Sequence, residues 1–234
     1  MNRKQIAVLA LPIIAIGVLF GYSLAVGIPS GFDTPSLDFP IEETDRIERI
    51  SAYHTPDWGE TGVFHNGIDL VISDNVTIIS PVRGTVVAYG EQINPYAGNV
   101  LFDITIAINW GWEVHLTIEP GFRDESNNTL QSTLINAHPP QQVSPGDELA
   151  TLLFSENYPH LHFMLLNLGA DVCAYNYSTP AAAAVFDTIA TDSNSTILYP
   201  YTQTSPLLAP YGLIMIGATS IFCIVVLIVF RPRR

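Results

Sequence analysis

The sequence predicts a mainly β domain with antiparallel strands, flanked by two transmembrane α-helices. Between residues 47 and 178, short runs rich in β-branched and aromatic residues alternate with glycine and proline breaks, as in strands joined by turns. Two uncharged apolar runs, Ile6 to Ile28 and Tyr211 to Phe230, lie outside this region. About 20 helical residues cross the hydrocarbon core of a bilayer, so both runs are long enough to span it.

The basic residues at the two ends of the chain predict its orientation. Arg3 and Lys4 precede the first apolar run, and three arginines follow the second. Positively charged flanks stay in the cytoplasm, so we expect both termini inside the cell membrane and the β domain outside. A cleaved signal peptide is the alternative for the first run, but that run is long and its cleavage pattern is poor. Cleavage would leave the domain on the same side.

The region between the apolar runs is strongly acidic. It holds all 22 acidic residues of the chain but only four arginines and no lysine, which gives it a net charge of −18. This charge argues against nucleic acid and anionic lipid headgroups as partners. Four N-x-S/T sequons, which begin at Asn75, Asn127, Asn176 and Asn194, fit an exported, glycosylated surface.

Changes in composition divide the chain into five parts. They are a cytoplasmic stub and transmembrane helix (1–28), a linker (29–46), the β domain (47–178), a stalk (179–210), and a transmembrane helix with a basic cytoplasmic tail (211–234). Strands are expected over 68–72, 76–79, 84–89, 100–108, 113–118, 149–154 and 161–168. Residues 122–142 carry no strand pattern and are interpreted as a functional loop or a decoration. Helical period is expected only over 180–189.

Histidines and one aspartate form the candidate chemical site. His65 and Asp69 are four residues apart with a glycine between them, and His160 and His162 are separated by one leucine. Positions i and i+2 of a strand point to the same face, so His160 and His162 would emerge side by side. His115 lies on a third apolar segment.

These residue types suit a catalytic zinc ion, which takes three nitrogen or oxygen ligands from the protein and keeps one position for water. Spacing alone leaves the question open, because a histidine in a strand is usually a packed or exposed residue without metal. His54 and His138 stand outside any pattern and are interpreted as surface or loop residues. Cys173 is interpreted as a small buried residue rather than a nucleophile.

Five sequence elements, in order, resemble the lysostaphin-like, or LytM-like, zinc endopeptidases. Residues 65–69 read H-N-G-I-D, residues 80–90 form a G-T-V-V-A hairpin element, and residues 115–116 read H-L. Residues 143–149 resemble the turn before the last strands of that family, and residues 160–163 read H-L-H-F. The resemblance covers about residues 47 to 170.

The resemblance implies a fold, a cofactor and a role for each residue. The fold would be an antiparallel β sandwich-barrel hybrid, and one Zn²⁺ per chain would be held by His65, Asp69 and His162. His160 and His115 would be the catalytic histidines beside the metal. The substrate would be a peptide or peptidoglycan-like cross-link of the cell envelope.

Three departures from the family pattern bear on the substrate. Residues 153–159 replace a glycine-rich run, Met164 stands where the family often has glutamate, and the segment between residues 116 and 143 is longer than usual. None of them removes a predicted ligand.

The leading hypothesis is therefore a membrane-anchored zinc metalloendopeptidase that acts on an envelope peptide through metal-activated water. The alternative is a non-catalytic LytM-like module that binds or regulates envelope proteins. A structural or transport-adaptor role ranks third, because it leaves the histidines unexplained.

Overall fold

The structure is a computed structural model that describes residues 17–18 and 20–199. Two compact units divide the chain: residues 28–202 form one, and residues 1–27 with 203–234 form the other. In the second unit the described residues form a helical segment over 17–18 and 20–26. It ends at Gly27, whose φ of 75° suits a glycine at a helix C-terminus.

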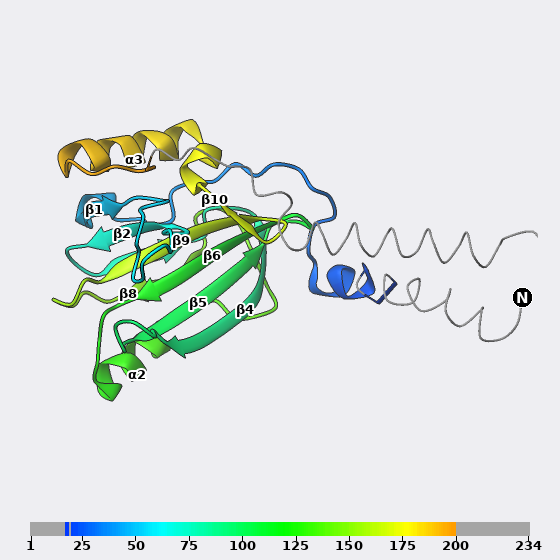
Figure 1. Ribbon diagram of the computed structural model, residues 1–234. Coiled ribbons are helices and arrows are strands. Elements are labelled where there is room, and N and C mark those ends of the chain that lie inside the picture. The colour runs from blue at the N-terminus through cyan, green and yellow to red at the C-terminus, as the bar shows by residue number, and fades with distance from the viewer. Residues whose placement is uncertain (1–16, 19, 200–234) are drawn as a thin grey trace, which may run out of the picture. The chain divides into compact units, whose positions relative to one another are not determined.

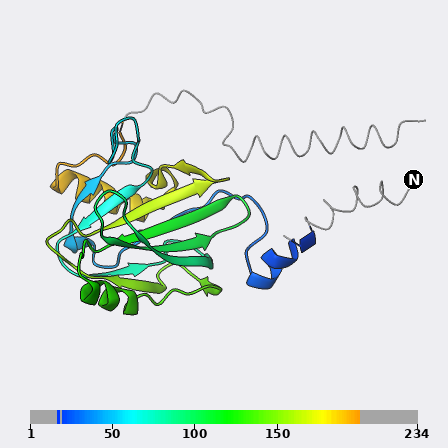
Figure 2. The ribbon, with the colours of Figure 1, turned by 60° about the horizontal axis from the view of Figure 1, so that its bottom comes forward.

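An antiparallel sheet forms the body of residues 28–202 (Figures 1 and 2). Its strands follow the order β1-β2-β9-β6-β5-β4-β7, and β10 pairs with one end of β9. They are β1 (Ile47–Ser51), β2 (Ile68–Ile72), β4 (Gly84–Ile93), β5 (Val100–Ala107), β6 (Trp112–Glu119), β7 (Gln141–Val143), β9 (His160–Asn167) and β10 (Ala170–Val172). A second, two-stranded sheet joins β3 (Val76–Ile79) to β8 (Glu148–Leu152).

Alternation along the central strands gives the large sheet an apolar face and a polar face. On β9, Leu161, Phe163 and Leu165 are fully buried, whereas His162 and Met164 between them are partly exposed. Strands β5 and β6 repeat the pattern, because their alternate isoleucine, leucine, valine and phenylalanine residues have no exposed surface. The apolar face packs with β3 and β8 in one hydrophobic core, so the histidines of β9 must lie on the opposite face.

Segments outside the predicted β domain complete this core. Leu37, Phe39 and Ile41, from the expected linker, are buried, and Phe186 of α3 (Pro180–Asp192) has no exposed surface. The Phe39 and Phe186 rings meet edge to face with centroids 4.7 Å apart. Figure 1 shows α3 lying alongside β1. Two 3₁₀ turns, η1 (Thr44–Arg46) and η2 (Ala174–Tyr177), connect these segments to the sheet.

The polar segment 122–142 contains a helix that its composition did not reveal. Helix α2 (Glu125–Thr133) begins at Asp124, whose side chain accepts a hydrogen bond from the backbone N–H of Asn127. A side-chain cap of this kind stabilises a helix that lacks an apolar stripe. Gln131 is the buried residue of α2, and it donates to Thr151 O while accepting from the N–H of Leu153. Two hydrogen bonds thus attach the helix beside β8.

The mainly β prediction is confirmed, but the two flanking transmembrane helices are not. Among the described residues, no helix is long and apolar enough to cross a membrane. Helices α2 and α3 have 9 and 13 residues, whereas a bilayer crossing takes about 20. Most of the first apolar run and all of the second lie outside the described residues. The predicted membrane partner therefore has no support.

We expect Phe186→Ala to destabilise the full-length chain by about 3–5 kcal/mol, because it empties a fully buried aromatic site where α3 meets the core. The measurement is the urea midpoint, compared with the exposed Thr188→Ala on the same helix, which should change stability by less than about 0.5 kcal/mol. Equal midpoints for the wild type and Phe186→Ala would contradict the placement of α3.

Candidate metal centre

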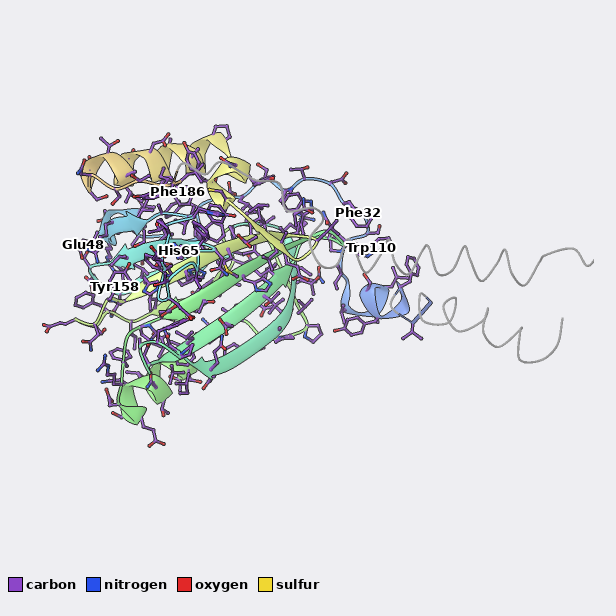
Figure 3. All side chains as sticks on the ribbon, viewed as in Figure 1. Phe32, Glu48, His65, Trp110, Tyr158 and Phe186 are labelled. Atoms are coloured by element: carbon purple, nitrogen blue, oxygen red, sulfur yellow. The ribbon has the colours of Figure 1, made fainter. Side chains whose placement is uncertain are left out.

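Two neighbouring strands and the segment before them bring three predicted residues together. Asp69 on β2 lies directly opposite His162 on β9 in the antiparallel register. His65 reaches the same point from the chain just before β2. Figure 3 shows His65 in front of the sheet, near β2 and β9.

The ligand atoms of these residues form a small triangle. His65 Nε2 lies 3.0 Å from Asp69 Oδ1 and 3.2 Å from His162 Nδ1, and His162 Nδ1 lies 2.7 Å from Asp69 Oδ1. Ligands about 2.05 Å from a tetrahedral zinc ion stand roughly 3.3 Å from one another. The donor set and its spacing therefore fit a zinc ion, and these three residues form a group that could hold a metal.

The hydrogen bond at the far side of the His65 ring fixes its tautomer. Its Nδ1 lies 2.8 Å from the carbonyl oxygen of Ala52, which can only accept, so Nδ1–H is the donor. In the neutral ring Nε2 then presents a lone pair toward Asp69 and His162. Three electron pairs directed at one point repel each other unless a proton or a metal cation lies between them. Backbone carbonyls orient metal-binding histidines in this way.

Asp69 is a buried carboxylate with one oxygen that lacks a hydrogen-bond partner. The residue is 1% exposed, and its Oδ2 is buried without a described partner. Burial alone would raise the pKa of Asp69, but hydrogen bonds from His162 and His65 and the charge of His160 hold that pKa below its usual value. A buried anion with a free oxygen is a site that a cation stabilises, which supports the metal assignment.

His160 stands beside the triangle between two carboxylates. Its Nδ1 donates to the carbonyl oxygen of Tyr158 at 2.9 Å. Its Nε2 lies 3.5 Å from Glu119 Oε1 and 3.8 Å from Asp69 Oδ2. Burial lowers the pKa of His160, but Glu119 and Asp69 outweigh burial and raise the pKa to about 9.

His115 lies on the same polar face but farther from the triangle. On β6 its register partner is Met164, while Thr117 is the partner of His162, so His115 and His162 are diagonal neighbours. Diagonal pairs across an antiparallel ladder are about 7–8 Å apart. The side chain of His115 is 30% exposed, and its Nε2 lies 3.2 Å from Glu113 Oε2. It borders the open surface that a substrate would occupy.

The other two histidines lie in loops, in line with their interpretation. The rings of His54 and Phe64 face each other with centroids 4.8 Å apart. His138 meets Tyr89 edge to face at 5.7 Å. Neither belongs to the metal group found among the described residues.

Sequence reasoning missed two residues that contact this site. Glu119 approaches His160 because the two are register partners on β6 and β9. Trp58 stacks on the His65 ring, with centroids 4.1 Å apart and planes 23° from parallel. Glu119 could have been found only from the strand register, and Trp58 only from the course of an irregular loop.

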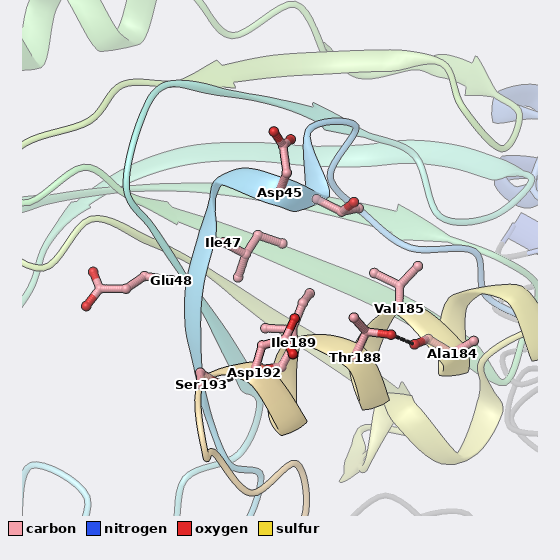
Figure 4. Close-up of a pocket in the computed structure, with 10 residues that line it drawn as sticks. Asp45, Ile47, Glu48, Ala184, Val185, Thr188, Ile189, Asp192 and Ser193 are labelled. Carbon is pink, nitrogen blue, oxygen red and sulfur yellow. Dashed lines mark hydrogen bonds between the residues drawn. The ribbon is translucent and has the colours of Figure 1, made fainter.

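A separate hollow lies between β1 and α3 (Figure 4). Ile47, Val185 and Ile189 give it an apolar lining, and Asp45, Glu48 and Asp192 also line it. No histidine or cysteine lines this hollow, so the candidate chemistry stays with the histidine site.

No protein-family model matches the sequence, and no curated protein matches it. Solved structures do match. The neighbours are peptidases of the M23 type, lysostaphin among them.

Three of these structures illustrate the extent of the match. A zinc-containing peptidase from Vibrio cholerae is 20% identical with a TM-score of 0.42, over 59% of this chain and 39% of that one. The catalytic domain of lysostaphin from Staphylococcus simulans is 15% identical with a TM-score of 0.38, over 55% and 90%. A variant catalytic domain of EnpA, a prophage-encoded M23 protein from Enterococcus faecalis, is 16% identical with a TM-score of 0.38, over 62% and 94%. At these identities the likeness concerns the fold, and what this chain does must be argued from its own residues.

We expect Gly67→Ala to weaken zinc binding at least tenfold while the chain stays folded. An added Cβ would lie 2.6 Å from Cε1 and 2.7 Å from Nε2 of His162, so it would displace the ring. The control is Gly90→Ala, where the Cβ meets nothing within 4 Å. Zinc affinity is measured by competition with a chromophoric chelator, and equal affinities for the two variants would contradict the described position of His162.

In the metal-free chain, His160 should make stability depend on pH. Its folded-state pKa, about 9, is above the unfolded value of 6.5. Its contribution is therefore complete below pH 6.5 and is lost as pH rises through 9. Urea midpoints in the presence of a chelator should fall across this window for the wild type and fall less for His160→Gln. Parallel pH profiles would contradict the described surroundings of His160.

Proposed function

We propose that the chain is a zinc metalloendopeptidase that hydrolyses a peptide bond in a peptidoglycan-like substrate of the cell envelope. The observation that carries the proposal is the triangle of ligand atoms from His65, Asp69 and His162, closed to 2.7–3.2 Å around a buried carboxylate. The acidic charge and the four sequons favour a site of action outside the cytoplasm.

In this proposal the three residues hold one zinc ion per chain. When bound, zinc supplies Lewis acidity and lowers the pKa of a water molecule toward neutrality. The Ala52 carbonyl keeps the Nε2 of His65 available as a ligand atom. Asp69 contributes its negative charge from a position that bulk water does not reach, because it is 1% exposed.

The other two histidines handle protons in this proposal. His160 holds a proton at Nε2 toward Glu119 and Asp69, so it can stabilise an oxygen that gains negative charge when the peptide carbonyl is attacked. His115 lies on the more exposed side of the same face, beside Glu113. There it can give a proton to the leaving amine or take one from water. Their positions on adjacent strands put the scissile bond between them.

Metal content and peptide hydrolysis test the proposal on the full-length chain. We expect about one zinc per wild-type chain under metal-replete conditions, and loss of that zinc in His65→Ala and Asp69→Asn. Hydrolysis is followed by mass spectrometry on a peptide set that includes oligoglycine and cross-linked cell-wall peptides. No stoichiometric zinc in the wild-type chain would overturn the proposal. Bound zinc without hydrolysis of any peptide would favour the non-catalytic envelope module.

His160→Gln and His115→Gln should keep zinc but reduce turnover by about 10²–10⁴-fold, because each removes a proton-handling group. The matched control is His138→Gln, which changes a loop histidine beside Tyr89 and should leave turnover unchanged. Turnover and zinc content are measured on the same samples. Unchanged turnover in both His160→Gln and His115→Gln would exclude these roles.

A further inference from the structure

The ring of His65 is restrained on three sides by the protein. Its Nδ1 edge donates to the Ala52 carbonyl, and its Nε2 edge faces Asp69 and His162. One face of the ring is covered by the indole of Trp58, with centroids 4.1 Å apart and an interplanar angle of 23°. A hydrogen bond at one edge leaves a ring free to tilt, whereas a stacked aromatic face opposes that motion. No role is yet assigned to Trp58.

The chain between residues 54 and 65 is folded into a hairpin that places this indole. Residues 54 and 65 are joined by a backbone hydrogen bond of 2.8 Å, and the N–H of Trp58 donates to Val63 O at 2.9 Å. Asp57 Oδ1 accepts from the N–H of Gly62 at 2.7 Å. Left-handed backbone occurs at His54, Asp57, Gly59 and Gly62, with φ between 55° and 83°. These bonds and turns bring Trp58 back over His65.

The tip of the hairpin rests on the connection between β4 and β5. A Cβ added at Gly59 would lie 3.5 Å from the ring of Tyr96, so the glycine backbone packs against that ring. The hairpin thus reaches from the β2 side of the polar face to the β4–β5 connection. Trp58, next to this contact, is held between the hairpin tip and the metal ligand.

A purely structural role fits Trp58 poorly. Trp58 is half-buried and is not one of the buried residues of the hydrophobic core. Trp112, by comparison, is 4% exposed and belongs to that core. Removing Trp58 would therefore leave the core filled, and the ring contact that it would remove is one with a candidate metal ligand.

We propose that Trp58 is a positioning residue for the metal centre: it holds the plane of the His65 ring and keeps water from the face that it covers. This inference rests on the proposed zinc site. Groups that orient a metal-binding histidine, and the apolar shell around it, set metal affinity, and their loss typically costs 10–100-fold. Trp58→Ala should therefore weaken zinc binding at least tenfold and speed its release, whereas Trp58→Phe, which keeps a stacking face, should stay within about threefold of wild type.

The experiment titrates the metal-free, full-length chain with Co²⁺ and follows tryptophan emission. A paramagnetic ion held by His65 should quench Trp58 strongly, because the indole stacks on that ligand. The matched control is Trp110→Phe, which removes a surface tryptophan that meets Phe32 edge to face and should keep the quenching. Trp58→Phe should abolish the strongly quenched component while still binding metal. Zinc affinity and release are measured separately with a chromophoric chelator.

The outcomes separate this inference from the proposed function. If wild-type chain binds neither Co²⁺ nor Zn²⁺, the proposed function fails and the inference fails with it. If the wild type binds metal but Trp58→Ala matches its affinity and release rate, the inference alone is overturned. Because Trp58→Ala could unfold, its urea midpoint is measured beside that of Trp58→Phe. Should Trp58→Ala not fold, Co²⁺ quenching that persists in Trp58→Phe would overturn the inference.

Discussion

The pairing of β2 with β9 is the constraint on which the candidate site depends. In its register Asp69 lies opposite His162, and the neighbouring pair Leu70 and Leu161 faces the core. A slip of one residue would turn the carboxylate and the imidazole into the core and two leucines to the polar face. Burial of the leucines therefore fixes where the two polar groups meet. The same packing that stabilises the sheet positions its chemistry.

Charge compensation is the second constraint on the site. Asp69 is buried in a region that contains four arginines and no lysine, and the groups in contact with its carboxylate are histidines. Histidines can share a proton with a buried carboxylate or leave their electron pairs to a metal ion. A lysine or arginine at the same point would neutralise the carboxylate permanently and block a metal ion. The histidine set thus satisfies the buried charge and keeps the point open to a cation.

The strands could be predicted closely because their signal is local. The expected runs 68–72 and 76–79 have the bounds of β2 and β3, and alternation also located β5, β6 and β9 within one residue at each end. Helix α2 escaped notice because it has no apolar stripe and is held by the Asp124 cap and by Gln131. Segments 29–46 and 179–192 looked like linker and stalk by composition, yet Phe39 and Phe186 meet within the core. Composition does not record which distant segment covers an apolar face.

The sequence by itself determined which residues carry the chemistry and which of them share a strand. Period-2 alternation placed His160 and His162 on one face, and the order of five motifs singled out His65, Asp69 and His115. Only the tertiary structure decided that Asp69 and His162 lie opposite each other, that Glu119 reaches His160, and that Trp58 covers His65. These contacts join residues that strand register and loop closure bring together. Register and closure follow from burial across the whole sheet, which no local stretch of sequence specifies.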